Sequence, residues 1–117
     1  MSNTHQSKII FDVNLDENKV PETISWTAED AGMKNRDTKA IMLAIWDTKD
    51  KETLKMDLWT KEMPLDEMKI FYHQTLVSMA DSFERATNDT KMAATMRDFT
   101  DYFAEKLDLL KKPTAEK

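Results

Sequence analysis

Two apolar stretches joined by a charged turn, between Ala40 and Trp59, constrain the fold of this chain more than any other feature. The second stretch, Thr53–Trp59, alternates apolar and polar residues, which is the pattern of a strand with one buried face. The first, Ala40–Trp46, is apolar on both sides, so its pattern fits a buried helical turn or a central strand. We favour a strand, because TKDKE between the stretches suits a hairpin loop of ordinary length.

The pairing of these two strands decides which side chains face the core. We expect Ile45 to lie opposite Met56, with Met42 roughly opposite Trp59. One face then collects the residues expected in the core, which are Ile41, Leu43, Ile45, Leu54, Met56 and Leu58. The other face keeps Met42, Trp46 and Trp59, and a slip of one residue would exchange the two faces of the first strand. In either register an apolar surface remains that needs a cover.

Two more strands are predicted nearer the N-terminus. Lys8–Asp16 alternates cleanly between apolar and mostly polar positions, and Val20–Thr27 alternates after a short polar turn. Pro21 fits an edge strand or an early strand position. The segment Ala28–Asp37 holds the only glycine, Gly32, and we expect it to be an exposed loop.

The C-terminal part of the chain has helical spacing. Pro64–Thr87 and Lys91–Lys111 repeat apolar residues every three or four positions, and Pro64 suits the first helical position. Asn88 and Asp89 lie between the two stretches, where they would end one helix and cap the next. So short a link predicts an antiparallel pair of helices.

The predicted fold class is therefore α+β, a four-stranded antiparallel β-meander followed by a two-helix antiparallel hairpin (β-β-β-β-α-α). We expect a disordered tail at 1–7, a single α+β domain at 8–111 and a second tail at 112–117.

Composition excludes several classes of function. The chain of 117 residues has no cysteine, so it has no disulfide framework and no thiolate site. One glycine is too few for the loops that cradle phosphates. A net charge of −5 argues against nucleic-acid binding. The start of the chain has no apolar leader and no later stretch is apolar enough to span a bilayer, so we expect a cytoplasmic protein without membrane insertion.

Few residues are candidates for chemistry. The only histidines are His5, in the expected tail, and His73, so a metal site that uses both is not expected. His73 could be a general base, but a partly buried or interfacial histidine is the reading we favour. Asp47 and Asp57 could form a carboxylate pair, yet we favour solvated or turn-capping aspartates. We expect no catalytic residue, no cofactor and no metal; a small enzyme stays as a third hypothesis.

The large apolar residues on the strands suggest a protein interface instead. Aromatic residues beside an apolar strand are enriched at interface cores, so we favour an interface over burial under the domain's own helices or loop. The predicted interface residues are Ile10, Met42, Trp46 and Trp59. We expect a homo-oligomer with further protein partners.

The sequence also resembles a known family. The segment from Trp46 to Asp89, with its stretch LKMDLWTKEM, and the later MRDFTDYFAEKL resemble the gliding motility-associated protein GldC, and the opening KIIFDVNLDENKVPETISWTAED is similar as well. The resemblance spans roughly residues 8–107. It implies a small, non-enzymatic accessory protein of gliding Bacteroidetes, with partners in the gliding or type IX secretion machinery and no catalytic motif.

The expected architecture is, in addition, similar to that of SecB-type export chaperones, which hold unfolded clients in apolar grooves. No sequence motif supports this likeness, and fold alone does not imply function. It gives the alternative hypothesis, a cytoplasmic holdase for exported or type IX secreted clients.

Overall fold

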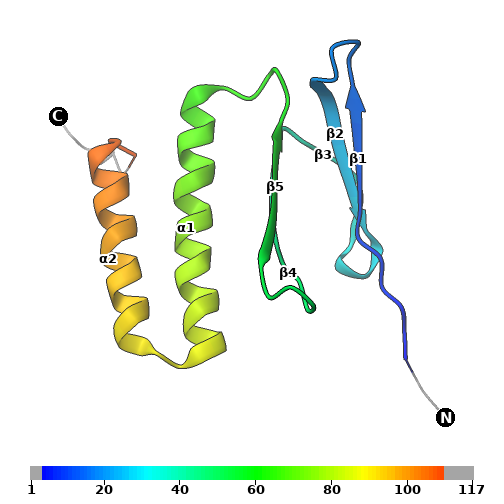
Figure 1. Cartoon of the computed structure of the whole chain (residues 1–117). Helices are drawn as coiled ribbons and strands as arrows, with labels where there is room; N and C mark the ends of the chain where they lie inside the picture. The colour runs from blue at the N-terminus through cyan, green and yellow to red at the C-terminus, as the bar shows by residue number, and fades with distance from the viewer. Residues whose placement is uncertain (1–3, 110–117) are drawn as a thin grey trace. The chain divides into compact units, whose positions relative to one another are not determined.

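The computed structural model describes residues 4–109, which form five strands, a 3-10 helix and two α-helices (Figure 1). These elements are β1 (Ile10–Leu15), β2 (Pro21–Ala28), η1 (Glu29–Ala31), β3 (Met33–Thr38), β4 (Ala40–Trp46), β5 (Thr53–Trp59), α1 (Leu65–Thr87) and α2 (Thr90–Lys106). They group into two compact units, the first ending at Met63 and the second beginning at Pro64. The α+β class, the antiparallel strands and the two helices are confirmed.

The prediction of a single four-stranded meander is wrong. The strands form a three-stranded sheet in the order β1-β2-β3 and a separate two-stranded sheet, β4-β5. Only Lys39 separates β3 from β4, and because the commonest tight hairpin loop needs two residues, these consecutive strands do not pair. The four-stranded prediction also missed β3, which lies, except for Thr38, inside the segment expected to be a loop.

β3 was not predicted because its sequence does not alternate between apolar and polar residues. It reads MKNRDT, and its four central side chains are exposed. As an edge strand it pairs with β2 through its backbone, with Trp26 opposite Arg36 and Ile24 opposite Thr38. Charged side chains are common on such edges, where they discourage pairing with other chains.

The first sheet has its core on the central strand. Ile24 of β2 is only 2% exposed, and the neighbouring Trp26 stacks on Phe11 of β1 with ring centroids 6.3 Å apart. Pro21 is the first residue of β2, the early strand position expected of it. Gly32 turns the chain from η1 into β3 with a φ of 76°, a left-handed conformation that glycine adopts without steric cost.

The two helices meet through small side chains. Those buried on this pair are Ala80, Ala93, Thr100 and Ala104. The link is capped as expected: Asn88 is left-handed and its N–H donates to Glu84 O at 2.8 Å, and the Asp89 carboxylate accepts from the N–H of Met92 at 3.0 Å.

The ends of the helices differ slightly from the prediction. Pro64 is in an extended conformation at the N-cap, so α1 starts one residue later. α2 ends at Lys106 because Asp108 is left-handed, with a φ of 58°, and Leu109 N–H donates back to Ala104 O. Residues 110 and 111 of the predicted helix, and the predicted tail 112–117, lie outside the described residues. That 8–111 is a single domain stays a prediction.

Candidate interaction surface

The β4–β5 hairpin carries most of the predicted interface. Its strands pair without interruption from Ala40 opposite Trp59 to Trp46 opposite Thr53. The turn is held at its base by Asp47 N–H, which donates to Glu52 O at 2.8 Å. The predicted pairing of Ile45 with Met56 is wrong, since Ile45 lies opposite Leu54. The shift is two residues, and because side chains alternate with a period of two, it leaves the predicted faces unchanged.

One face of this hairpin is apolar along its whole length. Its cross-strand pairs are Ile41 with Leu58, Leu43 with Met56, and Ile45 with Leu54. These are the residues expected in the core, yet Ile45 is 56% and Met56 53% exposed. Any even shift of the register keeps these six residues on one face, as predicted, but the pattern did not predict that Ile45 and Met56 are exposed.

The opposite face holds three of the predicted interface residues. Met42, Trp46 and Trp59 lie on it together, with Trp46 64% and Trp59 50% exposed. Met42 lies opposite Asp57 and not opposite Trp59, whose partner is Ala40. The tryptophans therefore stand at opposite ends of the hairpin, about 20 Å apart along the strands.

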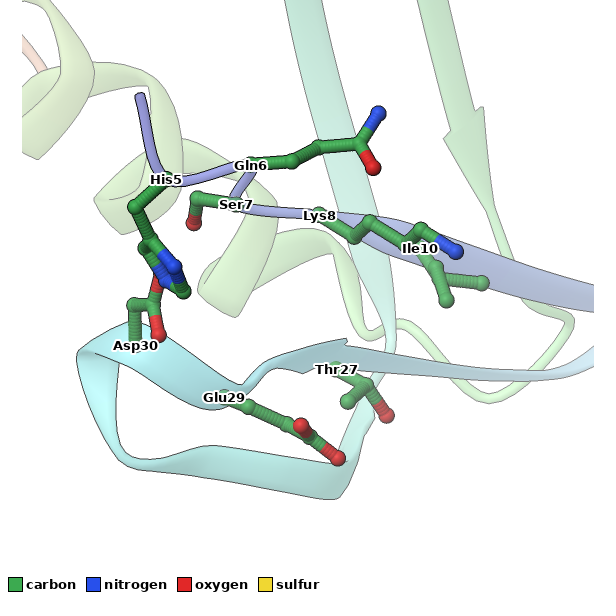
Figure 2. A pocket seen from close by; sticks show the side chains of 8 residues that line it. All are labelled: His5, Gln6, Ser7, Lys8, Ile10, Thr27, Glu29 and Asp30. Atoms are coloured by element: carbon green, nitrogen blue, oxygen red, sulfur yellow. The ribbon is translucent and has the colours of Figure 1, made fainter. Parts of the chain in front are cut away.

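Ile10, the fourth predicted interface residue, lies elsewhere. It begins β1 in the other sheet, opposite Thr27, and is exposed. It lines an open pocket between the N-terminal segment and η1, where His5 contacts Asp30 at 3.0 Å (Figure 2). Both of these side chains are more than half exposed, so the pocket does not exclude water. In the sheet topology, Ile10 and the hairpin belong to different sheets.

An ion pair ties the hairpin to the three-stranded sheet. Asp16, in the turn after β1, accepts hydrogen bonds from the N–H groups of Asn18 and Val20 and pairs with Lys61, just after β5. The hydrogen bond from Lys61, and next that from Val20, hold the pKa of Asp16 below its ordinary value. The same carboxylate raises the pKa of Lys61.

The candidate catalytic residues are not brought together. The Asp47 carboxylate accepts from Asp50 N–H at 2.7 Å in the turn, whereas the Asp57 carboxylate pairs with Lys55 at 2.6 Å on β5. From the register, the two aspartates are five residues apart along the hairpin, about 17 Å. His73 is half-buried and stacks on Phe103 with ring centroids 6.2 Å apart, the packing of a structural histidine.

Within residues 4–109, no group of three histidine or carboxylate side chains is arranged to hold a metal ion. No described helix combines the length and the apolar character that crossing a bilayer requires.

Comparison with known proteins gives one result. A family model described as gliding motility-associated protein GldC-like matches residues 21–109. This region takes in β2 to β5 and both helices, including the hairpin surface. No curated protein and no solved structure matches the chain.

Proposed function

Because this chain belongs to the GldC-like family, we propose that it is a non-enzymatic, cytoplasmic accessory protein of bacterial gliding motility that acts by binding other proteins. The family match over residues 21–109 is the observation that carries the proposal. Its partners would be proteins of the gliding or secretion machinery.

The hairpin is the surface that best suits such binding. Large exposed apolar side chains gathered in one place are typical of protein-binding sites, whereas scattered ones are ordinary. Trp46 and Trp59 are the side chains most suited to anchor a partner, because tryptophan is over-represented among residues that dominate binding energy. Met42, between them on the same face, adds an adaptable apolar contact.

A gliding assay combined with crosslinking tests this function. A strain that lacks the gene is complemented with Trp46→Glu plus Trp59→Glu, and we expect colony spreading to fall towards that of the deletion. Phe99→Glu is the matched control, because Phe99 on α2 is as exposed as Trp59. A photo-crosslinking residue at position 59 should trap a gliding or secretion protein. Normal spreading by the double variant at normal protein level would refute the proposal.

The holdase alternative has a narrower basis. Its analogy assumed a four-stranded sheet, whereas the described strands form sheets of three and two. What favours it is the exposure of apolar side chains on both faces of the hairpin. A holdase should suppress aggregation of an unfolded client at stoichiometric excess, and Trp46→Glu plus Trp59→Glu should weaken that suppression. Absence of any suppression by the unmodified chain would eliminate it.

A further inference from the structure

β4 has an edge with no strand partner among residues 4–109, and it lacks the features that protect such edges. Exposed edges are ordinarily guarded by charged residues, proline or bulges. β4 reads AIMLAIW and is the one described strand without a charged residue. Its ladder with β5 runs through seven residues without a bulge, so the strand is regular as well as uncharged.

The register shows which backbone groups point away from β5. Thr60 N–H donates to Lys39 O, and Asp47 N–H donates to Glu52 O, so Lys39 and Asp47 are hydrogen-bonding positions of the ladder. Such positions alternate along an antiparallel pair. The intervening even-numbered residues, among them Met42 and Ala44, therefore direct their N–H and C=O groups to the open edge.

We propose that β4 pairs antiparallel with β4 of a second copy of this chain, around a two-fold axis at Leu43. In this register Met42 lies opposite Ala44 of the second copy, and Ala40 lies opposite Trp46. All four are residues whose backbone groups point outward. The Ala40 C=O, which accepts from the Thr38 hydroxyl at 3.0 Å, has a second lone pair for the new bond. The two hairpins become one four-stranded sheet in the isologous arrangement of a two-fold dimer.

Charge complementarity favours a second copy of this chain as the partner, and it favours the register centred on Leu43. Lys39 and Asp47 flank β4, and the two-fold at Leu43 sets Lys39 of each copy opposite Asp47 of the other. Opposite charges directly across an antiparallel pair are favourable. A slip of two residues would set Lys39 opposite Ile45, or Asp47 opposite Ile41. The strand is therefore complementary to itself in charge as well as in backbone pattern.

The dimer would also bring Trp59 of each copy close to Trp46 of the other. On one face, Trp59, Ala40 and Trp46 of the second copy would lie in one row, with the two tryptophan Cα atoms about 10 Å apart. Their rings would meet over the small Ala40 side chain. This inference goes beyond the proposed function, since it concerns the purified chain alone and does not depend on any gliding partner.

Cysteine crosslinking tests the register. The chain has no cysteine, so a single Leu43→Cys variant reports only contacts of that position. On the axis, two copies of residue 43 lie close enough for a disulfide, and we expect most of the protein to crosslink under mild oxidation. Met56→Cys is the matched control, because it faces Leu43 across the hairpin but would lie three strands from its counterpart. Equal crosslinking of both variants, or none at Leu43→Cys, would overturn the proposal.

A proline scan of the two edges tests the pairing itself. Ala44→Pro removes an outward N–H and leaves the bonds to β5 in place, so light scattering should show the mass falling from two chains to one. Asp57→Pro removes an outward N–H from the β5 edge and should leave the dimer intact, since Asp57 lies opposite Met42. Circular dichroism checks that both variants fold. A monomeric unmodified chain, or a dimer that persists in folded Ala44→Pro, would overturn the proposal independently of any gliding result.

Discussion

At the scale of single residues, the Asp16 carboxylate links the turn after β1 to the segment after β5. Its carboxylate closes the turn after β1 and pairs with Lys61 beyond β5. Its pKa is lowered in the folded protein, chiefly by Lys61. The stabilisation is therefore present above the unfolded value of about 3.8 and is lost as the pH falls through the lower folded value.

We predict that Asp16→Asn lowers the free energy of unfolding at pH 7, and that the difference from the unmodified protein shrinks as the pH is taken below 3.8. Urea unfolding followed by tryptophan fluorescence measures this. Asp12→Asn makes the same change of charge on an exposed position of β1 and should have little effect. A loss of stability that is constant from pH 7 to pH 3 would show that charge at Asp16 is not its cause.

At the scale of elements, alternation predicted β1, β2 and β5, the length of the TKDKE loop decided in favour of a strand at β4, and helical spacing predicted both helices. Alternation could not predict β3, because charged side chains on an exposed edge strand show no apolar periodicity. It could place Met42, Trp46 and Trp59 on one face, since any even shift of register keeps that face. It could not place Ile10, whose position depends on the division into two sheets.

The packing of the two helices can be tested at this scale, because two neighbouring alanines on α2 differ in burial. Ala93 is fully buried, whereas Ala94 is exposed. Leucine at a close-packed position forces the helices apart, so Ala93→Leu should destabilise the protein by about 1–3 kcal/mol. Ala94→Leu makes the same chemical change and should be nearly neutral. Unfolding followed by the helical signal at 222 nm compares them, and equal losses would contradict tight packing at Ala93.

At the scale of the whole molecule, the remaining question is whether the two units unfold together, as the single-domain prediction for 8–111 requires. Each has a small core: Ile24 and Ala28 are the buried hydrophobic residues among the described strands, and small side chains fill the helix pair. A two-stranded hairpin is marginal by itself in water, and helices in proteins draw most of their stability from packing against other elements. We therefore expect one cooperative transition.

The positions of the tryptophans allow the unfolding of the two units to be followed separately. All three tryptophans, Trp26, Trp46 and Trp59, precede Pro64, so fluorescence follows the first unit while the signal at 222 nm follows mainly the helices of the second. Ile24→Ala opens a cavity and should cost about 2–5 kcal/mol. At fixed protein concentration, which matters if the chain dimerises, we expect both signals to move to the same lower urea midpoint. If fluorescence shifts while the helical signal keeps its midpoint, the two units fold separately, because a loss confined to Ile24 has then failed to reach α1 and α2.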